Sequence, residues 1–162
     1  MSSFNRRTLL VFPLAVLAAC GFTPVYGPGG TGAALRGQVN VAAPESVNGY
    51  LLVRELEDRL GRPVNPTYDL GLVLVTETQG QAITASDETT RYSIIGSLGY
   101  ALTSKTTGAV VASGDVQNFT GYSATGTTVE TLAAERDAFE RLMVILADQL
   151  VATLYSTVDP SE

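Results

Sequence analysis

The chain has 162 residues, with 16 acidic and 10 basic side chains, a formal net charge of −6 and no histidine. Because it lacks the excess of lysine and arginine that nucleic-acid binding requires, we expect no nucleic-acid partner. Its length fits one domain of ordinary size, and its single cysteine, Cys20, excludes an internal disulfide.

The N-terminal residues have the three parts of a secretory signal peptide. Two arginines at 6–7 precede a short apolar run that ends in small residues directly before Cys20. Residues 17–20, Leu-Ala-Ala-Cys, resemble a bacterial lipobox, which predicts that Cys20 is lipidated and that the chain is cut before it. The apolar run is shorter than the roughly 20 residues of a spanning helix. We therefore expect a lipid-anchored protein, and the paired arginines leave Sec and twin-arginine export both open.

The sequence predicts four segments. They are a lipoprotein signal peptide over 1–19, a lipidated N-terminus and flexible tether over 20–34, a single α+β domain over 35–157, and a C-terminal tail over 158–162. The tether is rich in glycine, proline and threonine. Its two aromatic residues, Phe22 and Tyr26, could be stray or could pin it to the domain or to a partner.

The first half of the domain alternates between strand and helix patterns. A short alternating stretch predicts a strand over 36–42, and leucines four residues apart predict a helix over 47–60. Ser46 is placed to cap this helix and Gly61 to end it. The strand predicted over 68–76 is apolar on both faces, which favours a central strand covered on both sides. The polar stretch 77–90 then predicts a long functional or mobile loop.

The second half contains a predicted hairpin and a long helix. Strands are expected over 91–103 and 109–119, joined by a loop at 104–108, with Gly114 favouring a bulge. Thr127-Thr-Val-Glu130 matches a capping box at the start of a helix that reaches about residue 155. This helix exceeds the width of the sheet, so part of its apolar stripe should overhang. The predicted fold is α+β, β-α-β-β-β-α, with two helices packed on a four-stranded mixed sheet.

The residue types for common catalytic chemistry are scarce. Without histidine, and with its one thiol assigned to lipid, the chain lacks the usual general base, metal ligand and nucleophile pairs. Asp87-Glu88 is the only tight acidic pair outside the predicted helices, and a solvated loop explains it better than a cation site. We expect an interaction protein and not an enzyme, with no cofactor and no metal.

Seven short stretches, taken in order, resemble the LPS-assembly lipoprotein family LptE in its alphaproteobacterial form. The clearest is Tyr122-Ser-Ala-Thr-Gly-Thr with the helix segments that follow it. The stretches cover residues 20–26, 89–92, 99–102, 105–108, 122–127, 133–138 and 142–150.

The resemblance implies a place and a partner. It implies a lipoprotein anchored to the periplasmic face of the outer membrane that sits inside the LptD β-barrel, helps to assemble it, and assists lipopolysaccharide transport. It also implies that basic residues at strand three and its hairpin contact lipopolysaccharide. Arg91 and Lys105 are the residues that match, although an ion pair with Asp87 or Glu88 would equally explain Arg91.

Two other functions remain compatible with the residues themselves. One is an auxiliary lipoprotein of an envelope ABC-type lipid transporter, and the other is a lipid-tethered periplasmic small-molecule binder. The binder would need a large closed apolar pocket, whereas the predicted sandwich has a filled core. The sequence leaves open whether lipopolysaccharide is bound directly and which surface meets the barrel.

Overall fold

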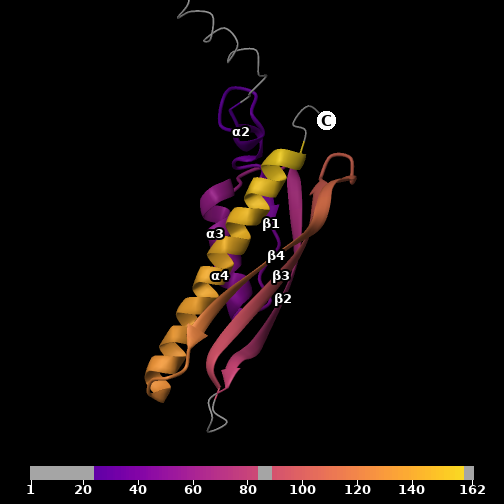
Figure 1. Ribbon diagram of the computed structural model, residues 1–162. Coiled ribbons are helices and arrows are strands. Elements are labelled where there is room, and N and C mark those ends of the chain that lie inside the picture. The colour runs from indigo at the N-terminus through magenta and orange to yellow at the C-terminus, as the bar shows by residue number, and fades with distance from the viewer. Residues whose placement is uncertain (1–23, 84–88, 159–162) are drawn as a thin grey trace, which may run out of the picture.

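The computed structural model, which describes residues 24–83 and 89–158, is a two-layer α+β sandwich (Figure 1). The predicted arrangement of two helices on a four-stranded mixed sheet is confirmed, with a short helix, α2, added before it. The elements are α2 (Thr31–Leu35), β1 (Val39–Val41), α3 (Val47–Leu60), β2 (Tyr68–Ile83), β3 (Thr89–Ser104), β4 (Val110–Ser123) and α4 (Thr128–Thr157).

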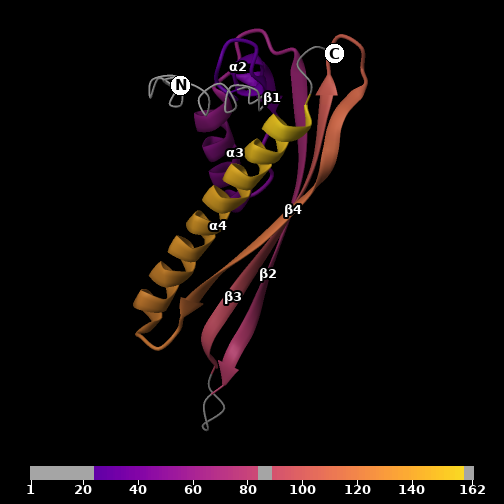
Figure 2. The same cartoon turned by 45° about the horizontal axis from the view of Figure 1, so that its top comes forward.

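The sheet has the strand order β1-β2-β3-β4. The short strand β1 pairs with β2 in parallel, whereas β2–β3 and β3–β4 are antiparallel hairpins. Figures 1 and 2 show α3 and α4 side by side on one face of the sheet, with α4 running along the length of the long strands. The described helices therefore cover only one face, which we call the inner face; the opposite face is the outer face.

Local sequence signals set both ends of α3. The Ser46 hydroxyl accepts a hydrogen bond of 3.0 Å from the Gly49 amide, which satisfies one of the free donors at the helix start. Gly61 ends the helix with φ at +77°, and its amide donates to the Glu57 carbonyl at 2.8 Å. Both predicted boundaries are confirmed.

The start of α4 is fixed by the predicted capping box. The Thr127 amide donates to a Glu130 carboxylate oxygen at 2.7 Å, and the Glu130 amide donates back to the Thr127 hydroxyl at 3.4 Å. The first turns of this helix project beyond the core, because Val129 is 76% and Leu132 50% exposed. The expected overhang of the apolar stripe therefore lies at the N-terminal end of α4.

The core fills the space between the inner face and the two helices. It is a single apolar cluster, and no polar or charged side chain of the described residues is fully buried. Its largest buried members are Leu35, Leu52, Leu56, Leu60, Leu70, Ile94, Leu98, Leu102, Leu142, Met143, Leu146 and Leu150.

An ion-pair network on the rim joins the two long helices. Arg59 of α3 donates to Asp148 of α4 at 2.5 Å and to Glu55 at 2.9 Å. These contacts raise the pKa of Arg59, chiefly through the hydrogen bond to Asp148, and the hydrogen bond from Arg59 lowers the pKa of Glu55. Arg59 therefore links α3 to α4 and also bonds to Glu55, one turn earlier in α3.

The prediction that β2 is covered on both faces is wrong. Val73 and Val75, on the outer face, are 67% and 60% exposed. Both helices pack on the inner face and on each other. No described helix is left to cover the other side, so an apolar outer face here does not mean burial within the chain.

The predicted loop over 77–90 is also largely wrong. β2 continues to Ile83 and β3 begins at Thr89, while residues 84–88, which include Asp87 and Glu88, lie outside the described residues. Pairs such as Glu77–Ile95 and Gln79–Ser93 extend the ladder through this polar stretch. Cross-strand pairing, and not apolar alternation, makes these residues a strand.

Gly114 is not at a bulge. It pairs regularly with Tyr100, and the irregularity in the β3–β4 ladder falls between Leu102 and Thr103. A Cβ at Gly114 would lie 3.3 Å from the Tyr100 hydroxyl oxygen. The glycine therefore makes room for the tyrosine ring that crosses it.

Gly96 sets how closely α4 approaches the sheet. A Cβ at this position would lie 2.9 Å from a Leu146 methyl carbon and 3.1 Å from one of Leu142. We expect Gly96→Val to lower the free energy of unfolding by about 1–3 kcal/mol through overpacking, measured by urea denaturation.

Gly99→Val is the matched control on the same strand. Its Cβ would meet Val73 on the outer face at an ordinary 3.7 Å. We expect a change within about 0.5 kcal/mol. Equal destabilisation by the two variants would contradict this account of the α4 contact.

Candidate functional site

The N-terminal part of the described chain packs against the C-terminal end of α4. The Tyr26 ring meets the Tyr155 ring edge to face, with centroids 5.6 Å apart, and the Thr31 hydroxyl donates to the Val158 carbonyl at 3.4 Å. Leu35 of α2 is buried in the core. From Pro24 onward, then, the segment expected to be a flexible tether is held on the domain, with Tyr26 as one of its contacts.

Cys20 lies outside the described residues, four positions before Pro24. Its lipidation stays a prediction of the sequence. The position of Pro24 does fix the end of the domain at which a lipid on Cys20 would be attached. That is the end where α4 finishes and where the β3–β4 hairpin turns (Figure 2). We call it the anchor end.

Lys105 lies at the anchor end, in the turn after β3. Its backbone amide donates to the Thr67 carbonyl at 2.9 Å, and its ammonium group lies 3.5 Å from an Asp69 carboxylate oxygen. The same carboxylate accepts a hydrogen bond of 2.8 Å from Asn40. The Asn40 hydrogen bond and then the Lys105 charge lower the pKa of Asp69. Lys105 is thus already engaged with an acidic neighbour.

Arg91 lies near the opposite end, which we call the distal end, where β3 begins. Its exposed side chain borders a small groove of 240 Å³ formed with Gly121, Tyr122 and Ser123. At the same end of the sheet the Tyr92 and Tyr122 rings are stacked, with centroids 5.3 Å apart and an angle of 14° between the planes. The pKa of Tyr122 is raised, chiefly because its hydroxyl group is partly buried. The acidic partners considered for Arg91, Asp87 and Glu88, fall outside the described residues.

The structure does not bring Arg91 and Lys105 together. Arg91 lies near the start of β3, and Lys105 is the first residue after its end. The 13 positions from Arg91 to Ser104 alone correspond to about 43 Å at the rise of an extended strand. One ligand headgroup cannot contact both. The strand predicted over 91–103 already carried this information, because its length places the two residues at opposite ends.

The sequence did not indicate the exposed outer face of the sheet as a functional surface. Phe119 is 68% exposed there, beside a shallow groove of 470 Å³. Polar side chains lie between the apolar ones, and Gln117 donates to Ser97 at 3.1 Å. The alternation of Val73 and Val75 signalled an apolar surface at this place, but pattern alone cannot tell a covered face from an exposed one.

The described residues were also compared with what a metal site or a membrane span requires. Within 24–83 and 89–158, no three acidic or cysteine side chains gather in a way that could hold a metal ion. Over the same residues, no helix combines the length and apolarity needed to cross a bilayer. The structure thus defines an α+β protein with one sheet face that no described helix covers.

The family model described as "LptE: Lipopolysaccharide-assembly" matches residues 37–154 of this chain. The chain therefore belongs to the LptE family, a family of non-enzymatic assembly lipoproteins. None of the curated proteins matches it significantly.

Solved structures show the same fold. A candidate lipoprotein from Caulobacter crescentus CB15 superposes with a TM-score of 0.62 at 21% identity, over 78% of this chain and 92% of that one. The rare lipoprotein B from Shewanella oneidensis gives 0.58 at 13% identity, over 74% and 93%. A minor lipoprotein from Acinetobacter baumannii gives 0.52 at 13% identity, over 73% and 88%.

The packing at the anchor end predicts a pH effect on stability. Burial raises the pKa of the Tyr155 hydroxyl, whose oxygen has no hydrogen-bond partner among the described residues. An unfolded tyrosine titrates near its ordinary value of about 10. The folded state therefore keeps its proton to higher pH, so the Tyr155 contribution is fully present below about pH 10 and is lost as the pH rises beyond it.

We expect Tyr155→Phe to remove this pH dependence. At pH 7 the variant should match the parent within about 1 kcal/mol, because no hydrogen bond is lost. Above about pH 10 the parent should lose stability more steeply than the variant. Urea denaturation of both proteins over this range tests the expectation, and parallel pH profiles would contradict it.

Proposed function

We propose that this chain is the lipid-anchored partner of an LptD-like outer-membrane β-barrel and acts in lipopolysaccharide transport. The observation that carries the proposal is the family match over 37–154, which spans the sheet and nearly all of both long helices. In this proposal Cys20 carries a lipid that anchors the chain to the periplasmic face of the outer membrane. The domain then occupies the lumen of the barrel.

The outer face is the surface proposed to meet the barrel wall. It runs the length of the long strands and has no helix on it among the described residues. It mixes polar side chains, such as Ser97 and Gln117, with exposed apolar ones, such as Val75 and Phe119. The interior of an outer-membrane barrel is polar, so a face that offers hydrogen-bonding groups between apolar contacts suits it.

The two ends of the domain are proposed to have different roles. The anchor end, with Lys105 paired to Asp69, stays near the membrane that holds the lipid. The distal end carries Arg91 and the Tyr92–Tyr122 stack. Arginine keeps its charge and can bind phosphate oxygens with two hydrogen bonds. We therefore assign Arg91, and not Lys105, as the stronger lipopolysaccharide contact.

Co-purification tests the partner. Tagged full-length protein, extracted from envelope membranes in mild detergent, should bring down an outer-membrane β-barrel. Phe119→Arg should reduce the recovered barrel about tenfold, because it places a charge in the centre of the proposed interface. Val64→Arg is the control, since Val64 is 89% exposed in a loop away from this face. Recovery of an inner-membrane transporter instead would refute the proposal.

Cys20→Ala tests the anchor. Because Cys20 precedes the packed segment, the variant should fold with unchanged thermal stability. Produced in cells that lack the barrel partner, which would itself retain the protein on the membrane, it should appear in the soluble fraction. Two or more acyl chains hold a protein on a bilayer, whereas the domain alone offers no such anchor. Mass spectrometry of the N-terminal peptide should find Cys20 acylated in the parent. A variant that stays on the membranes of those cells through detergent-free washing would refute lipid anchoring at Cys20.

A further inference from the structure

The edge of β2 next to β1 is mostly unpaired. β1 pairs with β2 at only three positions, of which the last is Val41 opposite Leu70. One more hydrogen bond follows, from the Ala42 amide to the Leu70 carbonyl at 2.9 Å. Beyond it the chain turns away to start α3. From Leu72 onward this edge has no strand partner among the described residues.

The backbone groups that face this edge can be assigned from the existing bonds. The Tyr68 amide donates to Gln38, and the Leu70 carbonyl accepts from Ala42, so these two residues direct their backbone groups toward β1. Directions alternate along a strand. The same edge therefore has free N–H and C=O groups at Leu72, Leu74 and Thr76. They face the space into which β1 would continue if it were longer.

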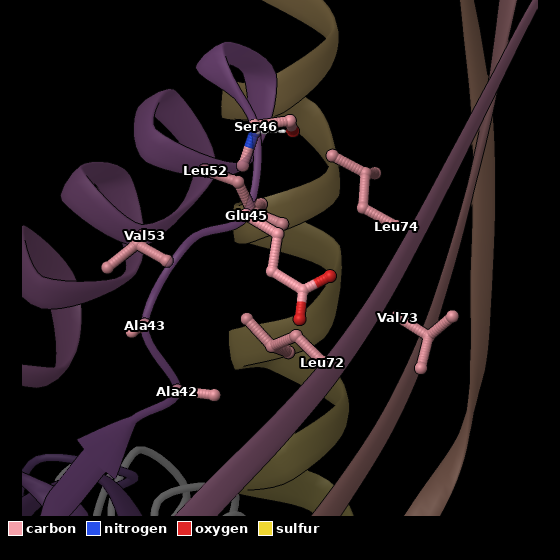
Figure 3. Close-up of a pocket in the computed structure, with 10 residues that line it drawn as sticks. Ala42, Ala43, Glu45, Ser46, Leu52, Val53, Leu72, Val73 and Leu74 are labelled. Atoms are coloured by element: carbon pink, nitrogen blue, oxygen red, sulfur yellow. Dashed lines mark hydrogen bonds between the residues drawn. The ribbon is translucent and has the colours of Figure 1, made fainter.

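A groove of 460 Å³ lies beside this free edge (Figure 3). It is bounded by the start of α3 and by the loop after β1. Its apolar walls come from Leu52 and Val53 on α3 and from Leu72 and Leu74 on β2. The groove thus combines an unpaired strand edge with apolar side chains on the inner side of that strand. These are the two features by which a protein binds an added strand.

The groove carries one charge. Glu45 is the only ionisable residue that lines it, and it forms no ion pair among the described residues. In Figure 3 its side chain extends from the loop into the space between α3 and Leu72. A negative group at this position favours a basic residue on whatever lies in the groove.

We propose that the β2 edge from Leu72 to Thr76 binds an extended segment of a partner protein, which adds a strand beside β2 in the line of β1. The segment alternates apolar side chains, which enter the groove, with outward ones, and carries a lysine or arginine next to Glu45. The proposal does not depend on a barrel partner, because it rests on the free edge, the groove and Glu45 alone.

The segment that packs from Pro24 onward lies at the other end of α3 from the groove. Gly37 bonds to Leu60, so the segment from Pro24 packs at the C-terminal end of α3, whereas the groove lies at the N-terminal end. A 14-residue helix separates them, which is about 21 Å.

Site-specific photo-crosslinking of the full-length protein in a Gram-negative envelope tests the proposal. The photoreactive residue p-benzoylphenylalanine is placed at Ala43, which is exposed and lines the groove. After irradiation, the cross-linked peptide is identified by mass spectrometry. We expect a segment of a different protein, with alternating apolar residues and a basic residue within the cross-linked stretch.

Two pairs of variants give the test its controls. Thr76→Pro removes an edge-facing N–H and should cut the cross-link about fivefold to tenfold, whereas Thr78→Pro, one edge position further from the groove, should leave it unchanged. Glu45→Lys should cut it about fivefold. Glu140→Lys is the control, because it reverses the same charge at an exposed position on α4. It should leave the cross-link unchanged. Circular dichroism checks that each variant is folded.

Several outcomes would overturn the proposal. They are the absence of a cross-linked product, a product formed with a second copy of this chain or with its own N-terminus, and a mapped segment without the alternating pattern. Equal yields from Thr76→Pro and Thr78→Pro would also overturn it. Failure to recover a barrel would count against the proposed function but leave this result intact.

Discussion

The close contact between α4 and β3 at Gly96 is the constraint on which the rest of the structure depends. It lets the leucine stripe of a 30-residue helix rest directly on the inner face of the sheet. α3 then fills the remaining part of the same face and is tied to α4 through Arg59 and Asp148. Because both helices are used on one side, the outer face and the β2 edge are left without cover from the described chain.

The parts of the fold that depend on local signals could be predicted from the sequence. Ser46 and the Thr127–Glu130 box mark helix starts by hydrogen bonds that form within one turn. The parts that depend on distant partners could not. Residues 77–83 are strand because β3 pairs with them. Val73 and Val75 alternate in the same way whether or not something lies on them.

The same distinction applies to the candidate site. The lipidation predicted at Cys20 rests on contiguous sequence alone, whereas the relation between Arg91 and Lys105 depends on how far β3 continues without a break. The free edge of β2 was the least accessible feature. It exists because β1 ends after three residues and the chain passes Pro44 into α3. Neither the length of β1 nor the groove that this early ending leaves has a sequence pattern of its own.

An apolar sheet face and an unpaired strand edge are liabilities for a protein that is free in solution, because both favour aggregation. This chain has both, and they point in different directions. The outer face points along the normal of the sheet, whereas the free edge of β2 points sideways within the plane of the sheet. One flat partner surface cannot cover the two together. A partner that surrounds the domain can cover the face with a wall and the edge with an extended segment. An enclosing partner of this kind would account for both exposures and would leave the distal end, with Arg91, directed away from the end at which the segment from Pro24 packs.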